Sequence, residues 1–129
     1  MKRWILALVV VGLLAVPGFF AARHLSERRR QTNNVRHDAQ GFTTALKIGN
    51  ERAAANYLAR PKMDSATLEQ ALRTHAQSLL STDFDAAPVT FRSDGAALLA
   101  TFHCSGGAAL TFYTEDSGDI WRVAELKSQ

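Results

Sequence analysis

The stretch VTFRSDGAALLATFHCSGGAALTFYTEDSGDIWRVAEL, residues 89–126, decides the fold. It contains short runs that are apolar or that alternate between apolar and polar residues, as half-buried strands do. The breaks between the runs, at Asp94-Gly95, Ser105-Gly106-Gly107 and Ser117-Gly118-Asp119, carry turn residues. Strands joined by tight turns pair antiparallel. The stretch therefore predicts a four-stranded antiparallel meander, with strands at Val89–Arg92, Ala97–Cys104, Ala109–Thr114 and Ile120–Leu126.

The segment before these strands has helical periodicity. Asp38–Arg60 carries apolar residues three and four positions apart, with Gly49-Asn50 as an expected break. A second helix is expected from Asp64 or Ser65, either of which can cap it, to about Leu80. Helices followed by strands predict an α+β fold, in which two or three helices pack on one face of a four-stranded antiparallel sheet.

Charge is divided unevenly along the chain. Residues 1–36 carry seven Lys or Arg and one acid, whereas residues 37–129 carry eight Lys or Arg and eleven acids. Trp4–Ala22 is a run of 19 residues without a charge. As a helix it would span about 28 Å, close to the bilayer core of about 30 Å. The sequence predicts a transmembrane signal anchor at residues 1–24, a polar basic linker at 25–37 and a small α+β domain at 38–129.

The anchor is expected to be retained, because no Ala-x-Ala cleavage pattern follows it. Counting the flanking positive charges would keep the domain in the cytoplasm, whereas a basic tip before an apolar run is an export signal. The export interpretation is preferred, which predicts a single-pass inner (cytoplasmic) membrane protein with a periplasmic domain. Basic charge beside an apolar run favours phospholipid head groups over nucleic acid as partner. The expected membrane-interface residues are Lys2, Arg3, Trp4, Arg23, Arg28, Arg29 and Arg30.

Residues that could carry chemistry are few. Cys104 is the only cysteine, and His103 beside it should point to the opposite face of its strand. The four histidines have no metal-ligand spacing, so neither a metal, a cofactor nor a catalytic set is assigned. His75 lies on the apolar face of the second helix, and the other three candidates would share a sheet face if the turns set the register. The candidate pocket or interface residues are therefore His75, His103, Tyr113 and Trp121.

Two segments resemble a known superfamily. Phe42-x-x-Ala45-Leu46-x-x-Gly49-Asn50, followed by Ala53 to Leu58, resembles the first helices of the nuclear-transport-factor-two-like superfamily, which includes ketosteroid isomerases and polyketide cyclases. Gly118-Asp119-Ile120-Trp121-Arg122-Val123 resembles its terminal strand. The resemblance covers roughly residues 38–126 and implies a cone-like roll, in which a curved sheet wraps helices around a pocket. Domains of this kind serve as enzymes, ligand binders, dimerisation modules and assembly subunits.

Two functional hypotheses follow. The first is a membrane-anchored binding or assembly domain without evident catalysis, which contacts a protein partner or a second copy through its open sheet face. The alternative is a small-molecule binder or an isomerase- or cyclase-type enzyme that uses the cone pocket, with His75 or His103 as polar group. The interior separates the two hypotheses: an apolar cavity with convergent polar groups favours the second, and a filled interior favours the first.

Overall fold

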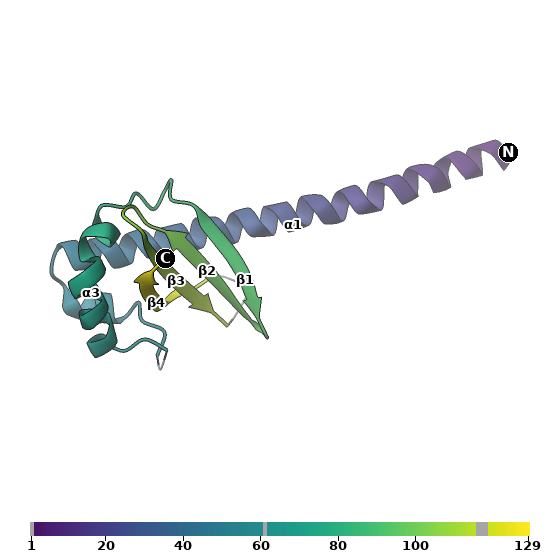
Figure 1. Ribbon diagram of the computed structural model, residues 1–129. Coiled ribbons are helices and arrows are strands. Elements are labelled where there is room, and N and C mark those ends of the chain that lie inside the picture. Colours follow the sequence, from purple (N-terminus) through teal and green to yellow (C-terminus); the bar gives the residue numbers. More distant parts are fainter. Residues whose placement is uncertain (1, 61, 116–118) are drawn as a thin grey trace. The chain divides into compact units, whose positions relative to one another are not determined.

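The helices precede the strands along the chain, as the sequence patterns predict. The computed structural model describes residues 2–60, 62–115 and 119–129, with side chains from Leu25 onward. Its helices are α1 (Lys2–Lys47), α2 (Glu51–Ala55) and α3 (Ser65–Leu80) (Figure 1). They precede the strands β1 (Val89–Asp94), β2 (Ala97–His103), β3 (Ala108–Thr114) and β4 (Arg122–Ser128). These strands form one four-stranded antiparallel sheet in the order β1-β2-β3-β4, so the α+β class and the meander are observed.

The chain divides into two units, residues 1–31 and residues 32–129. Helix α1 runs through the division without a break and supplies residues 32–47 to the second unit. The residues expected to be a polar linker, 25–37, are therefore helical, and their last part belongs to the compact unit. The folded domain begins about six residues before the expected boundary at 38.

The prediction of a membrane anchor is corrected by the structure. Within the described part of the chain, no helix combines the length and the apolar character needed to cross a bilayer. The helix that was expected to end near residue 24 continues to Lys47, and the side chains described on it begin with the charged stretch that includes Glu27 and Arg28–Arg30. The side chains of Trp4–Ala22, on which the prediction depended, lie outside the described residues. The single-pass assignment, the inner-membrane localisation and the periplasmic domain are therefore not retained.

The last turns of α1 carry an apolar stripe into the core. Val35, Ala39, Phe42 and Ala45 recur at spacings of three and four and are buried, so they lie on one face of the helix. Helix α1 ends at Lys47, and Gly49 follows with a φ of 73°, a backbone conformation that glycine adopts readily. This confirms the expected break at Gly49-Asn50.

Helix α3 begins where its capping residue predicts. The side chain of Asp64 accepts a hydrogen bond of 2.7 Å from the backbone N–H of Thr67, which satisfies one free donor of the first turn. Leu68 and Leu79 are the buried residues of this helix, and they join the same core as α1. Helix α3 contacts β3 and β4, and Figure 1 shows it beside the sheet.

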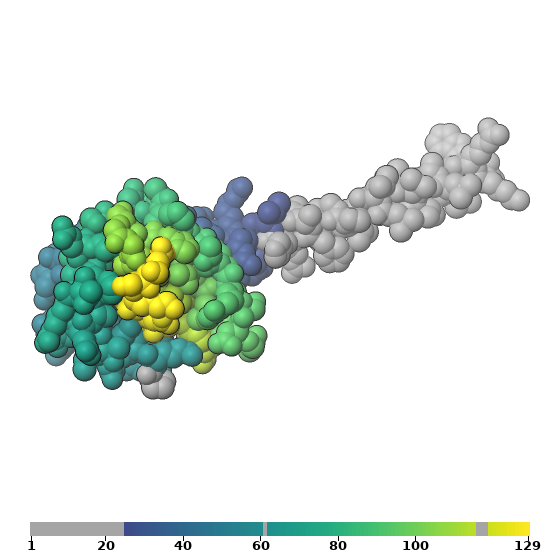
Figure 2. All heavy atoms as spheres, in the orientation of Figure 1, coloured from purple at the N-terminus to yellow at the C-terminus, as the bar shows by residue number. Residues whose placement is uncertain are grey.

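The short segment after α2 adds backbone pairing at the β4 edge. Ala59 donates its N–H to the carbonyl of Val123 at 2.8 Å, and Val123 donates to the carbonyl of Tyr57 at 2.6 Å. Leu58 and Val123 thus form a parallel bridge. Further along β4, the C-terminal residues lie at the surface between α3 and the other strands, where Figure 2 shows them in yellow.

Candidate functional site

The space between the helices and the sheet is filled by side chains. The largest fully buried residues include Trp121, Phe42, Phe102 and Phe112, each at most 2% exposed. Phe102 packs edge-on against Phe84 at 5.1 Å and against Phe112 at 5.8 Å between ring centroids. The helices and the inner face of the sheet therefore meet through a packed aromatic core, and the place where a cone pocket was expected is occupied.

The opposite surface of the sheet, here called the outer face, carries a different set of side chains. Strand alternation and the observed register assign the inner positions to residues such as Ala100, Phe102, Leu110 and Phe112. The residues between them point the other way. The outer face comprises Thr90, Arg92, Asp94, Ala97, Leu99, Thr101, His103, Ala109, Thr111, Tyr113, Arg122, Ala124, Glu125 and Lys127.

A groove of about 530 Å³ runs over the outer face, lined by residues of all four strands and by Lys62. At its centre, Thr101 and Thr111 are register partners, and their hydroxyl oxygens share a hydrogen bond of 3.0 Å. Leu99 lines the same groove and is 8% exposed. The groove thus has a floor of mixed polar and apolar character.

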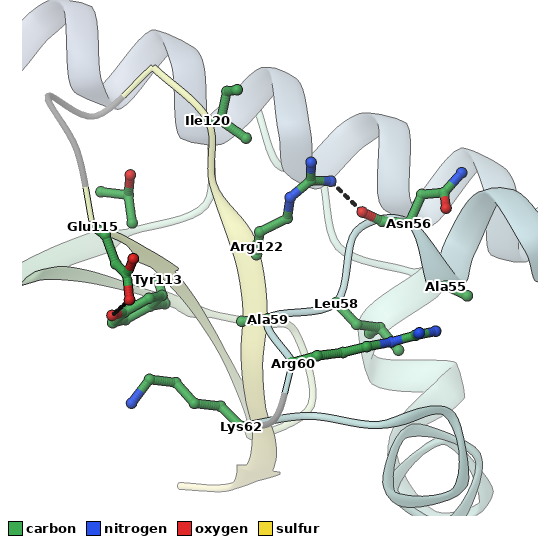
Figure 3. Close-up of a pocket in the computed structure, with 11 residues that line it drawn as sticks. Ala55, Asn56, Leu58, Ala59, Arg60, Lys62, Tyr113, Glu115, Ile120 and Arg122 are labelled. Carbon is green, nitrogen blue, oxygen red and sulfur yellow. Dashed lines mark hydrogen bonds between the residues drawn. The ribbon is translucent and has the colours of Figure 1, made fainter.

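A second cavity of about 590 Å³ lies where β3 ends and β4 begins, and Figure 3 shows its lining. The Lys62 ammonium lies 4.7 Å from the centroid of the Tyr113 ring, a cation–π contact. The Tyr113 hydroxyl donates a hydrogen bond of 2.7 Å to Glu115. This bond to a carboxylate, together with burial, raises the pKa of Tyr113 above its ordinary value. The bond thus favours the protonated form of Tyr113, which is the form that can donate to Glu115.

Positive charge predominates around these two cavities. Arg122 donates a guanidinium hydrogen bond to the backbone carbonyl of Asn56 (dashed in Figure 3). Lys127 forms an ion pair of 3.0 Å with Glu125. Among the described residues, Arg60, Lys62 and Arg92 make no ion pair with a carboxylate. Arg60 lies near enough to Asp64 to lower its pKa, and Lys62 contacts the Tyr113 ring. All three side chains are exposed and can be reached by an anionic group from outside the chain.

The residues predicted from sequence fall in different places. His103 and Tyr113 lie on the outer face, as the register argument expected, and His103 contacts the Gln129 side chain. Trp121 does not share this face: it precedes β4, is fully buried, and lies with its ring centroid 6.0 Å from that of Phe91. The cause is the register: Arg122, and not Trp121, is the partner of Tyr113, so strand alternation turns Trp121 to the inner side, where its backbone N–H donates to Asp38 on α1. His75 is half-buried on α3 and does not meet the other three.

The cationic side chains of this site were missed by the sequence reasoning. Arg92 and Arg122 lie on two different strands, and Arg60 and Lys62 follow α2, so no local motif connects them. The usable signal was strand alternation. Val89 and Phe91 are apolar and share one face of the strand, so Arg92, which follows Phe91, points to the other face.

Cys104 is buried, and burial raises the pKa of its thiol above the ordinary value. A buried, protonated thiol is a poor nucleophile and metal ligand. Within the described ranges, no group of three or more His, Cys, Asp or Glu side chains is close enough together to hold a metal ion.

The expected membrane-interface residues belong to the other unit. Lys2, Arg3, Trp4 and Arg23 have side chains outside the described residues. Arg30 forms a 3.0 Å ion pair with Glu27 one turn earlier on α1, and Arg29 is exposed. The arginine run thus has an acidic neighbour on its own helix.

Comparison of the chain with protein-family models, with curated proteins and with solved structures finds no significant match in any of the three.

Proposed function

We propose that residues 32–129 form a binding domain, and that the domain recognises another protein through the outer face of its sheet. The observation that carries this proposal is the contrast between the two faces. The inner face is closed by a packed aromatic core, whereas the outer face holds a groove of about 530 Å³ formed by all four strands. The groove has hydroxyls that can hydrogen-bond to a peptide backbone, and its charged margins match the polar rim of protein interfaces.

The filled interior also favours this proposal over the small-molecule alternative. A cone-pocket enzyme needs an enclosed cavity with convergent polar groups, and Trp121, Phe102 and Phe112 occupy that volume. The two histidines considered for such a pocket are separated, because His75 lies on α3 and His103 on the outer face of β2. The resemblance to the nuclear-transport-factor-two-like superfamily stays a proposal, and the assembly subunits among its members agree with a binding role.

Co-purification of the tagged full-length chain with variants of the groove tests the proposal. Thr111→Arg places a long side chain at the centre of the groove without touching the core. We expect this variant to lose a partner that the unaltered chain retains. Gln70→Arg, on the exposed surface of α3, is the matched control and should retain it. Equal recovery of every co-purified protein by the two variants would reject the outer face as a binding surface.

A further inference from the structure

The charges on the outer face indicate what kind of partner segment the face recognises. We infer that the outer face binds an extended acidic segment of a partner protein, whose carboxylates pair with Arg60, Lys62 and Arg92. This inference rests on the proposed protein-binding function and names the chemistry of the partner.

The first argument is the local excess of positive charge. Among the residues that the structure describes, five Lys or Arg side chains and three Asp or Glu side chains line the two cavities, although residues 37–129 as a whole carry more acids than bases. Two of the acids are already engaged, because Glu125 pairs with Lys127 and Glu115 accepts a hydrogen bond from Tyr113. The face therefore attracts anions on a domain that otherwise repels them. The lining residues that carry charge are Arg60, Lys62, Arg92, Arg122, Lys127, Asp94, Glu115 and Glu125.

The second argument is the spacing of the cations. Figure 3 shows Lys62 extended toward Tyr113 and Glu115, whereas Arg60 extends to the other side of the same segment. A compact anion such as phosphate is bound by donors that converge on one point. Donors that diverge suit carboxylates distributed along a chain, and in an extended chain the side chains of one face recur about every 6.6 Å.

The third argument is that the two cavities adjoin. Lys62 lines both, so the surface continues from Arg60, at the end of the sheet, to Arg92 on β1. An extended segment along this path would cross the Thr101 and Thr111 hydroxyls, which can hydrogen-bond to a peptide backbone. The face thus offers charge at its margins and hydrogen-bonding groups between them.

The same charges argue against a symmetric dimer through this face. In a two-fold interface each patch, lined by five cationic and three acidic side chains, meets its own copy, so two patches of net positive charge would repel each other. A separate acidic partner satisfies these cations, whereas a second copy of the outer face leaves them in repulsion.

Fluorescence anisotropy with the full-length chain tests the inference. The probe is a labelled ten-residue peptide of alternating Glu and Thr, and the matched probe has Gln in place of Glu. We expect the Glu peptide to bind at least about tenfold more tightly at an ionic strength of about 0.1 M, and to lose this advantage at about 1 M, where screening shortens from about 10 Å to about 3 Å. Lys62→Gln and Arg92→Gln should each weaken binding of the Glu peptide severalfold. Arg73→Gln, an exposed cation of α3 that pairs with Glu69, should leave it unchanged.

Three results would overturn the inference. Equal affinity for the Glu and Gln peptides would show that charge does not select the segment, and equal weakening by Arg73→Gln would show that general charge is responsible. Displacement of the Glu peptide by inorganic phosphate, at an equal concentration of negative charge, would indicate a site for a compact anion instead.

The failure of this inference is distinguishable from that of the proposed function. If Thr111→Arg loses its partner while the Glu and Gln peptides bind equally, the proposed acidic character of the partner segment is wrong and the binding function stands. If the Glu peptide binds more tightly while Thr111→Arg retains every partner, the proposed protein-binding function is wrong.

Discussion

Asp38 and Trp121, 83 residues apart in sequence, are joined by a hydrogen bond of 2.9 Å, in which the Trp121 backbone N–H donates to the Asp38 carboxylate. The bond fixes the start of β4 against α1 and holds the fully buried indole ring in the core. Arg122 is the partner of Tyr113 and points to the outer face, so strand alternation points Trp121 inward. The bond to Asp38 then ties this inward residue to α1.

Replacing Asp38 with Ala should destabilise the domain. The change removes the carboxylate that accepts the hydrogen bond from the Trp121 N–H. We expect the free energy of unfolding to fall by about 1–3 kcal/mol. Urea denaturation, monitored by tryptophan fluorescence, measures this free energy of unfolding. His37→Ala, at the neighbouring exposed position of the same helix, is the control and should change stability by less than about 0.5 kcal/mol. An Asp38→Ala variant as stable as His37→Ala would show that the bond contributes nothing.

Replacing Gly41 with Ala should create a clash that a second substitution relieves. A Cβ at Gly41 would lie 2.9 Å from Cζ of Tyr57 and closer still to its hydroxyl, and the Tyr57 ring also packs against Phe42 at 6.1 Å. We expect Gly41→Ala to lower stability by about 1–3 kcal/mol.

Adding Tyr57→Phe to Gly41→Ala removes the hydroxyl that the new methyl group meets first, so the double variant should recover part of the loss. A double-mutant cycle by thermal denaturation measures the coupling between the two positions. Strict additivity of the two changes would contradict the close approach of Gly41 to Tyr57.

The cap of α3 predicts a pH dependence. The backbone N–H of Thr67 is the main cause that lowers the pKa of Asp64 below its ordinary value of 3.8. Because the folded pKa is the lower one, the contribution of Asp64 to stability is present above the unfolded pKa and is lost as the pH falls through the folded pKa.

The stability gap between the unaltered chain and Asp64→Ala should therefore be constant near neutral pH and should narrow below about pH 4. Denaturation midpoints of the two chains between pH 7 and pH 2.5 test this. Ser93→Ala, at an exposed uncharged position of β1, should show no such narrowing. A gap that stayed constant to the lowest pH would mean that the Asp64 charge is irrelevant to the cap.

Residues 32–37 should be required for folding. Val35 is fully buried, and the Arg36 guanidinium donates to the carbonyls of Phe84 at 2.7 Å and Ala87 at 2.9 Å while lying 5.8 Å from the centroid of the Phe102 ring. A chain that begins at 32 should show a cooperative unfolding transition, whereas one that begins at 38 should lose it or shift it strongly downward. Circular dichroism melting distinguishes the two. Equal melting of both chains would place the domain boundary at 38, as the sequence suggested.

Most helices and strands of the domain could be predicted from the sequence, whereas the grouping of the cationic side chains on the outer face could not. Short-range signals were sufficient for the strands and for α3, because turn residues such as Asp94-Gly95 and the cap at Asp64 act within a few positions. The start of the domain was misplaced because the polar residues around Arg36 look like a linker. Only the folded chain shows that Arg36 satisfies two distant carbonyls.

The membrane prediction depended on the apolar run Trp4–Ala22, whose side chains lie outside the described residues. Within the described part of the chain, no helix is long and apolar enough to cross a bilayer. The cationic site was out of reach because Arg60, Arg92 and Arg122 are brought near one surface by sheet register and by the pairing of Tyr57–Ala59 with Val123. Such pairing has no local sequence signature. The inward placement of Trp121 depended on the register of β3 and β4, in which Arg122 and not Trp121 is the partner of Tyr113. The turn residues alone did not predict that register.

The most direct test of the outer face is site-specific photo-cross-linking in cells that naturally make the full-length chain. A photoreactive amino acid is placed at Thr111, in the centre of the groove, or at Gln70 on α3. The account predicts one discrete heavier adduct from position 111, absent from position 70 and weakened when Lys62→Gln and Arg92→Gln are added. The same adducts from both positions, or none from position 111, would contradict the claim that the outer face binds a protein partner.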